Sequence, residues 1–323
     1  MSEAPRSHEA RSEAARVWLA LLTVYVVWGS TYLAIRIVVT DLPPLVTAGS
    51  RFLIAGAIVA LAVIVRSGPG RFWLTRGQLA AAMLVGTALL LGGNGLVVLA
   101  EQTVPSAFTA LMIASTPLWV VVFRRVWGER IATGTLVGVV VGFVGVACLV
   151  VPAWTGSVAD PLGLVMLLLA AFSWASGSFI SSRATMPPDP FASTAIQMLT
   201  GGLLLLVVGL LRGEPFDLSA WPQASDAFLA WLYLIFVGSL AGFTAYTWVL
   251  QHAPISRVAT YAYVNPVVAV VLGVAILGEV ITPAMLVGGA IIVAAVALII
   301  RNETLQRRPQ EASAAPVTVE EIG

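Results

Sequence analysis

The chain has 323 residues, of which 59% are hydrophobic and only 10% charged, and its mean hydropathy is +0.95. About a quarter of the residues of a soluble domain are charged, so this composition excludes water as the solvent for most of the surface. The net charge of +1 gives no reason to expect nucleic-acid binding, and the single cysteine, Cys148, excludes an intrachain disulfide and a cysteine-based zinc site.

The amino-terminal residues 1–16 alternate Arg and Glu and lead into an apolar run that starts at Val17. This run is longer than the core of a signal peptide, and further apolar segments follow it. We therefore expect residues 1–16 to be a cytoplasmic tail that precedes an uncleaved first span.

Ten segments are long and apolar enough to cross a bilayer, whose core of roughly 30 Å requires about 20 residues of helix. This pattern predicts an all-α integral membrane protein with the lipid bilayer as its surroundings. The predicted spans are 17–39, 45–65, 78–100, 106–124, 131–151, 161–182, 191–211, 227–250, 256–277 and 283–300.

The two halves of the chain are copies of one plan. Residues 105–150 and 254–300 share a proline, at Pro117 and Pro266, and a Gly-Glu pair that ends at Glu129 and Glu279. The preceding segments also match, since Trp28-Gly29-Ser30 lies 146 positions before Trp174-Ala175-Ser176. Such duplication is typical of transporters built from structural repeats.

Each repeat contains five spans, an odd number, so the second repeat must enter the membrane in the opposite sense. We expect one five-helix repeat at 17–151, an inverted repeat at 161–300 and a cytoplasmic tail at 301–323. Inverted repeats favour alternating access, because the same plan then allows both an inward-open and an outward-open shape.

The arginines predict the orientation. With the amino terminus inside, 14 of the 17 arginines fall in inner segments and only Arg212 falls in an outer loop, while Arg36 and Arg51 lie inside spans. Because positive charge favours the cytoplasmic side, both termini should be cytoplasmic.

These features together resemble one known family. The double five-helix plan, the opening VWGSTYLAIRIVVTDLPPLVTAGSRFLIAG and the paired Pro…Gly-Glu stretches resemble the EamA branch of the drug/metabolite transporter superfamily over about residues 17–300. The resemblance implies a transporter of small metabolites in the cytoplasmic (inner) membrane, often an exporter, with a substrate chamber between the repeats. It does not name the cargo.

Polar and aromatic side chains form a stripe along the first span and another along the sixth. The stripes contain Tyr25, Trp28, Tyr32 and Arg36 in the first span and Trp174, Ser178 and Ser182 in the sixth. We predict that Trp28, Tyr32, Trp174 and Ser178 line a cavity for a small polar substrate. Interface-belt or packing roles are the alternative.

Arg51 lies about six residues inside the second span, where an unpaired charge is costly. Two interpretations remain open, an ion pair with Glu101 at the end of the third span or a contact with an anionic group of the substrate. Arg36, near the end of its helix, can snorkel or pair with Asp41.

Further polar residues on the third, eighth and ninth spans are predicted to line the same cavity. They are Asn94, Tyr246, Tyr261, Tyr263 and Asn265. Hydrogen bonds between helices are the alternative for these groups, and Asn265 can satisfy carbonyls that Pro266 leaves free.

Glu129 and Glu279 are interpreted as helix caps rather than proton carriers, because each lies in a turn leading into a helix. No acidic residue lies in the middle of a span, which leaves Glu101 and His252 as the remaining candidates for proton coupling. The glycine strip of the fifth span packs against the tenth span or forms a homodimer face; its members are Gly134, Gly138, Gly142 and Gly145.

Nothing in the sequence reads as an enzyme site. His8 and His252 cannot form a metal cluster, and no phosphate-binding loop follows a strand, so we expect no cofactor, no metal and no ATP-driven pump. The predicted function is secondary export of a small-molecule substrate, an amino acid or related amphipathic compound. The alternatives are an importer or bidirectional facilitator, and a membrane scaffold or sensor without flux.

Overall fold

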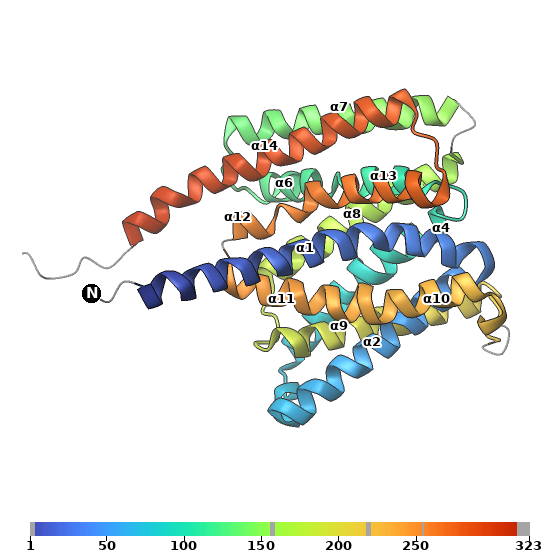
Figure 1. Ribbon diagram of the computed structural model, residues 1–323, viewed down its shortest axis with the longest axis horizontal. Helices are drawn as coiled ribbons and strands as arrows, with labels where there is room; N and C mark the ends of the chain where they lie inside the picture. Colours follow the sequence, from blue (N-terminus) through green and yellow to red (C-terminus); the bar gives the residue numbers. More distant parts are fainter. Residues whose placement is uncertain (1–3, 156–158, 218–220, 254, 315–323) are drawn as a thin grey trace, which may run out of the picture.

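The computed structural model describes residues 4–155, 159–217, 221–253 and 255–314, which form helices joined by short turns. Figure 1 shows the helices lying roughly parallel or antiparallel in one bundle. The α-helices are α1 (Ala4–Asp41), α2 (Pro44–Ser67), α3 (Arg76–Gly86), α4 (Leu96–Ala100), α5 (Ser106–Ile113), α6 (Thr116–Val126), α7 (Thr133–Thr155), α8 (Pro161–Arg183), α9 (Pro190–Leu211), α10 (Ser225–Tyr233), α11 (Gly242–His252), α12 (Ile255–Val258), α13 (Tyr261–Leu277) and α14 (Pro283–Ala314). Two π-helical stretches, η2 (Thr87–Gly95) and η4 (Leu234–Ala241), and two 3-10 turns, η1 (Pro69–Phe72) and η3 (Trp221–Gln223), complete the list.

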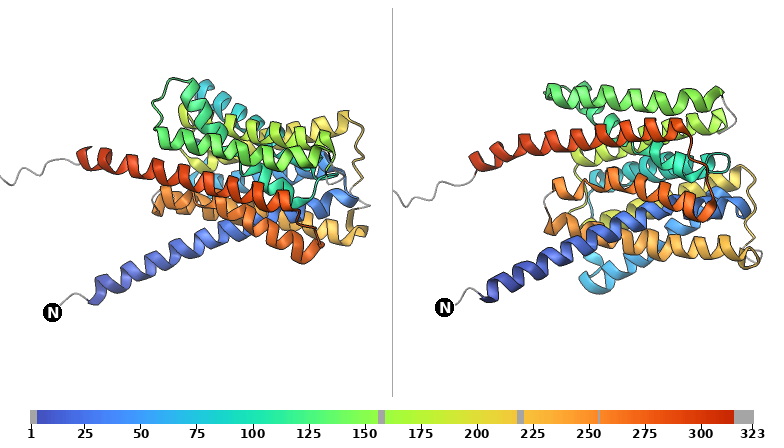
Figure 2. Two further views of the ribbon diagram at one scale, coloured as in Figure 1. Left: turned by 90° about the horizontal axis from the view of Figure 1, so that it is seen from above. Right: turned by 45° about the horizontal axis from the view of Figure 1, so that its top comes forward.

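The described residues include nine helices long and apolar enough to span a membrane and one shorter apolar helix, Tyr261–Leu277. These ten segments match the ten predicted spans, and the predicted fold class is confirmed. The start of α1 and the end of α14 project from the same side of the bundle in both views of Figure 2. We call this the terminal side and the opposite one the far side.

Several spans are less regular than predicted. The fourth span is divided into α5 and α6 two residues before Pro117. Proline lacks an N–H and its ring crowds the carbonyl four residues back, which here belongs to Ile113, the last residue of α5. The third and eighth spans each contain a π-helical stretch, at 87–95 and 234–241, which are equivalent positions of the two repeats. Such stretches are frequent at functional sites.

The helix contacts follow the predicted inverted symmetry. Gly49 lies against Leu206 of α9, Gly56 against Met198, and Gly209 against Leu45. The residue numbers run in opposite directions along the two helices, so α2 and α9, the second spans of the two repeats, are antiparallel. Since equivalent helices point in opposite senses, the two halves are inverted copies.

The glycine strip of the fifth span packs mainly against the tenth span. Gly138 lies against Ile299 and Gly145 against Ile291, so α7 and α14 approach closely, as Figure 1 also shows. Gly142 faces Leu118 of α6 instead. Within the chain, this strip therefore joins the repeats.

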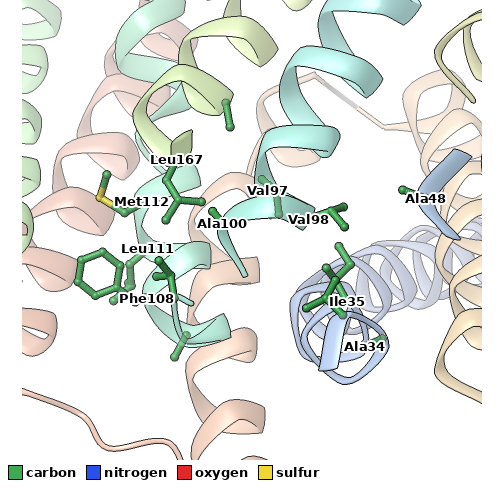
Figure 3. Packing of buried hydrophobic residues seen from close by; sticks show 14 of the residues in the cluster. Ala34, Ile35, Ala48, Val97, Val98, Ala100, Phe108, Leu111, Met112 and Leu167 are labelled. Atoms are coloured by element: carbon green, nitrogen blue, oxygen red, sulfur yellow. The ribbon is translucent and has the colours of Figure 1, made fainter. Parts of the chain in front are cut away.

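A buried apolar cluster lies where α1, α4, α5 and α8 meet. Figure 3 shows Phe108, Leu111 and Met112 of α5 beside Leu167 of α8, with α4 between this group and Ile35 of α1. This packing fixes the end of α4, where Glu101 follows, against the first turn of α5.

Candidate functional site

Four aromatic side chains from α1, α11 and α13 form a cluster that we call the aromatic cluster: Trp28, Phe243, Tyr246 and Tyr261. The Trp28 ring centroid lies 4.9 Å from that of Tyr246 and 5.3 Å from that of Tyr261. Tyr246 and Tyr261 are 5.6 Å apart and nearly perpendicular, the edge-to-face arrangement that aromatic rings favour. Trp28 therefore faces the second repeat, and three of the predicted lining residues, Trp28, Tyr246 and Tyr261, lie together.

Each of the two equivalent tryptophans lies against a glycine at or beside a π-helical stretch. A Cβ atom at Gly242 would lie 2.6 Å from Nε1 of Trp28, and one at Gly93 would lie 2.7 Å from Cε3 of Trp174. Real Cβ atoms do not approach other atoms so closely. These glycines therefore provide the space that each indole ring occupies.

Gly242→Ala is expected to displace Trp28 and to reduce transport, because the new methyl group would overlap the indole ring. Overpacking of this kind typically costs about 1–3 kcal/mol of stability. Thermal unfolding and transport in proteoliposomes measure the two effects. Gly77→Ala is the matched control, since its Cβ would meet nothing closer than 4.0 Å; equal losses in both variants would contradict the interpretation.

Arg51 is buried, with 6% of its surface exposed, and its Nε donates a 2.9 Å hydrogen bond to Oγ of Ser239 in η4. The guanidinium group also borders a small cavity of about 10 Å³, room for about one water molecule, which is lined by residues such as Thr47 and Trp231. No ion pair joins Arg51 to Glu101 within the described part of the chain. The ion-pair alternative is therefore wrong for this structure.

Asn94 in η2 and Asn265 in α13 are both buried, and the side-chain oxygen of each lacks a hydrogen-bond partner among the described residues. Buried amide oxygens without a partner are costly, so both groups can accept a hydrogen bond from a ligand or water.

The remaining predicted lining residues are partly buried and more dispersed. Ser178 donates its hydroxyl proton to the carbonyl of Trp174 in its own helix, at 2.9 Å. Tyr32 and Tyr263 pack at the edge of the main apolar cluster. The structure thus brings Trp28, Tyr246 and Tyr261 together, whereas Arg51 and Trp174 occupy separate positions.

On the far side, Glu279 binds the first turn of α5 in the other repeat, a set of bonds that we call the far-side contact. Its carboxylate accepts hydrogen bonds from the backbone N–H of Ser106 at 2.7 Å, from the Ser106 hydroxyl at 2.9 Å and from the N–H of Ala107 at 2.8 Å. Glu279 therefore acts as a helix cap, but for α5 of the other repeat. The prediction that it caps the helix that follows it is wrong, since Thr282 accepts a hydrogen bond from the N–H of Met285 in the first turn of α14.

On the terminal side, the equivalent Glu129 has different partners. Its carboxylate pairs with Arg124, with an N–O distance of 2.7 Å, and with Arg183 at the end of α8. Gly128 and Gly278, which precede the two glutamates, have φ angles of 92° and 64°. Glycine readily adopts such positive φ angles, and the turns are therefore alike although the bonds made by the two carboxylates are not.

Sequence reasoning missed three residues of these sites: Ser239, Phe243 and Glu214. The Glu214 carboxylate accepts hydrogen bonds from the N–H groups of Leu45 and Val46, both 2.9 Å long, at the start of α2. The signal for this role was available, because Gly213-Glu214 is a third Gly-Glu turn and Gly213 has a φ of 81°. Ser239 and Phe243 have no comparable signal.

The inverted five-helix repeats, with an aromatic cluster and a buried arginine between helices of both halves, define the class of a membrane transporter. The model of the EamA-like transporter family matches residues 16–151 and 161–301, so the chain belongs to this family. It is a multi-pass inner-membrane transporter, not an enzyme.

The relatives have names consistent with this class. The chain is 37% identical to the uncharacterized inner membrane transporter YedA of Escherichia coli K12, over 92% of this chain and 94% of that protein. It is 28% identical to a probable amino-acid metabolite efflux pump of Salmonella typhimurium, over 86% and 92% of the two chains. One solved crystal structure matches with a TM-score of 0.59 at 21% sequence identity. The match covers 92% of this chain and 99% of the solved chain, so the two share the same fold.

Proposed function

We propose that this transporter exports a small amphipathic metabolite, an amino acid or a related compound, by alternating access, with the terminal side in the cytoplasm. The observation that carries the proposal is the difference between the two Gly-Glu turns. The halves are copies of one plan, yet their Gly-Glu turns bind different parts of the other repeat. Glu279 binds the start of the fourth span, whereas Glu129 pairs with Arg124 of its own repeat and with Arg183 at the end of the sixth span.

This difference corresponds to one end state of a transport cycle. The far side is closed where α13 packs against α5, but α13 makes no comparably extensive contact with α6 nearer the terminal side. By the symmetry of the repeats, closure of the terminal side would bring Glu129 to the start of the ninth span, as Glu279 now meets α5. Alternation between the two arrangements would expose the substrate site to each side in turn.

The substrate class is supported by the chemistry of the site. The aromatic cluster offers apolar ring faces, and Arg51 is a buried cation without an anionic partner among the described residues. A molecule with an apolar side and a carboxylate matches both features. The name of the Salmonella relative agrees with an amino-acid substrate and with outward transport.

The orientation is supported by the arginines. Fourteen of the 17 arginines belong to the segments on the same side of the bundle as the two termini. Because positive residues favour the cytoplasmic side, the terminal side is expected to face the cytoplasm. A cysteine introduced at Val280, which is 79% exposed on the far side, should react with an impermeant maleimide in intact cells. Reaction only after the cells are opened would contradict this orientation.

Transport itself can be tested in proteoliposomes loaded with candidate amino acids. Counterflow of labelled substrate is expected, and resistance of overexpressing cells to toxic amino-acid analogues would support export. Accumulation of the analogue with increased sensitivity would favour import, while absence of any flux with folded protein would favour a scaffold or sensor.

Arg51→Met is expected to lower uptake of carboxylate-bearing substrates about 10- to 100-fold, because a charge-assisted hydrogen bond contributes roughly 1.5–3 kcal/mol. Methionine keeps much of the side-chain length and removes the charge. The measurement is the ratio of counterflow rates for an amino acid and for its decarboxylated amine. Loss of folded protein, detected by size-exclusion chromatography, or an unchanged ratio would contradict a substrate-binding role for Arg51.

A further inference from the structure

The carboxylate of Glu101 is the most deeply buried acidic group among the described residues. Glu101 follows α4, in the connection 101–105, and it has no exposed surface. Neither of its two carboxylate oxygens has a hydrogen-bond partner in the described part of the chain. A buried carboxylate in this environment is strongly destabilised when it is ionised.

The guanidinium group of Arg36 does not neutralise the Glu101 carboxylate. The guanidinium group of Arg36 donates a hydrogen bond to the main-chain carbonyl of Glu101 and forms no ion pair with its carboxylate. Arg51, the cation that the sequence suggested as a partner, binds Ser239 instead. The side chain of Glu101 therefore lacks the partner that a buried charge requires.

A second carboxylate increases the cost. Glu279 lies close enough to Glu101 for the two charges to repel each other. Among the described residues, Arg36 and Tyr32 of α1 are further ionisable groups that interact with Glu101. From α8, Gly163 packs against Thr103 and Val104 of the connection, while Asp160 at the start of that helix is exposed.

The two neighbouring carboxylates have opposite surroundings. Glu279 accepts three hydrogen bonds at the start of α5. Glu101 accepts none. Burial, and after it the charge of Glu279, raise the pKa of the Glu101 carboxyl well above its usual range, against the smaller opposing effect of Arg36. In this closed arrangement the Glu101 carboxyl therefore favours its protonated form.

We propose that Glu101 is a proton-binding site of the far-side gate: the gate closes with a proton on Glu101 and opens when that proton is lost to the medium on the far side. This inference rests on the proposed alternating access, since it assigns a ligand to one of its two gates. The proton comes from water on the far side, forms an O–H bond with one carboxylate oxygen and returns to the same medium.

A route to this medium lies beside the site. A depression of about 410 Å³ is lined by Arg36, Pro105 and Glu279, and also by the exposed residues Asp41 and Asp226. When Glu279 leaves α5, water can reach Glu101 through the space between α1 and the start of α5, and hydration then permits ionisation.

The sign of the pH effect follows from linkage. The closed state, with its raised pKa, binds the proton more tightly than the open, hydrated state. Closure is therefore favoured at pH values below the open-state pKa, and its advantage is lost as the pH rises from that value to the closed-state pKa. Acid on the far side should close the gate and alkali should open it.

The test uses full-length protein in liposomes, with Cys148→Ala to remove the native thiol and Thr109→Cys as a reporter. Thr109 has no exposed surface and lies on α5 behind the far-side contact, so an impermeant maleimide reaches it from the far side only when the gate is open. The rate of labelling is measured against pH with Glu101 and with Glu101→Gln, which mimics the protonated form. Thiol reactivity itself rises with pH in both proteins. The quantity to compare is therefore the labelling rate with Glu101 divided by the labelling rate with Glu101→Gln.

With Glu101 present, the ratio should be near one in acid and rise by up to about tenfold per pH unit above the ordinary pKa of a carboxyl group. Asp160→Asn, at the exposed start of α8 and outside the lining of this depression, should leave this rise intact. A ratio that does not change with pH, although labelling occurs, would overturn the proton site and leave alternating access standing. A reporter that is never labelled at any pH would overturn the gate and the proposed function together.

Infrared difference spectra provide a readout that does not depend on the gate. A carboxylic-acid C=O band should be present at pH values just above the ordinary pKa of a carboxyl group and absent in Glu101→Gln, provided that this variant elutes as folded protein. If Glu101→Gln does not fold, Glu101→Asp, which keeps the carboxyl group, should retain such a band. Absence of the band from the unmodified protein would overturn the proposal.

Discussion

Glu279→Ala is expected to shift the transporter strongly toward the state that is open on the far side. The substitution removes three hydrogen bonds that hold α13 to the start of α5. If these bonds together stabilise the closed state by roughly 2–3 kcal/mol, their loss raises the ratio of open to closed protein about 30- to 150-fold. Maleimide labelling of Thr109→Cys in the Cys148→Ala background measures this ratio, because Thr109 is buried while the gate is closed.

Glu129→Ala is the matched variant in the other repeat. If Glu129 closes the terminal side in the alternate state, its removal should destabilise the far-side-open protein and reduce labelling of the same reporter. The two substitutions should therefore act in opposite directions. Increased labelling in both variants would mean that the Gly-Glu turns stabilise the fold in general and do not select between two states.

Trp28→Ala is expected to reduce transport by up to about 10-fold while leaving the protein folded. The indole ring contacts Phe243, Tyr246 and Tyr261 from two helices of the other repeat. Each aromatic pair contributes about 0.5–1.5 kcal/mol of interaction free energy. A substrate that packs on the Trp28 ring loses a comparable amount of binding free energy when the ring is removed. Initial rates of counterflow in proteoliposomes measure the effect.

Two variants separate a binding role for Trp28 from a general effect of losing an aromatic ring. Trp28→Phe retains an aromatic surface and should recover part of the activity. Trp127→Ala removes a ring that is 69% exposed at the end of α6, and it should change the rate less than about twofold. Full transport by folded Trp28→Ala would remove the aromatic cluster from the substrate site.

The architecture could be predicted because hydropathy and duplication act over long stretches. Ten apolar segments of bilayer length, the match of Pro117 with Pro266 and the odd number of spans per repeat are sufficient to indicate inverted halves. The antiparallel pairing of α2 with α9 depends on glycines that are visible in the sequence, such as Gly49 and Gly202. These features do not depend on the rotation of any single helix.

The side-chain pairings were harder to predict because they depend on how each helix is rotated and shifted against its neighbours. Arg51 and Glu101 lie at similar predicted depths, but α2 directs Arg51 toward Ser239, and α1 brings Arg36 to the backbone of Glu101. The π-helical stretches at 87–95 and 234–241 change the rotation of the residues that follow them. A prediction that assumes a regular α-helix therefore assigns the residues beyond these stretches to the wrong side of the helix.

The most direct test of alternating access follows the two sides of one molecule together. One pair of spin labels, at Gln102 and Val280, lies on the far side, and a second pair, at Val126 and Arg257, lies on the terminal side; all four residues are exposed. Double electron–electron resonance in liposomes, with and without a transported substrate, gives the distance distribution of each pair. We expect the far-side pair to separate in the same fraction of molecules in which the terminal-side pair closes. Unchanged distances, or widening of both pairs together, would contradict alternation between two inverted repeats.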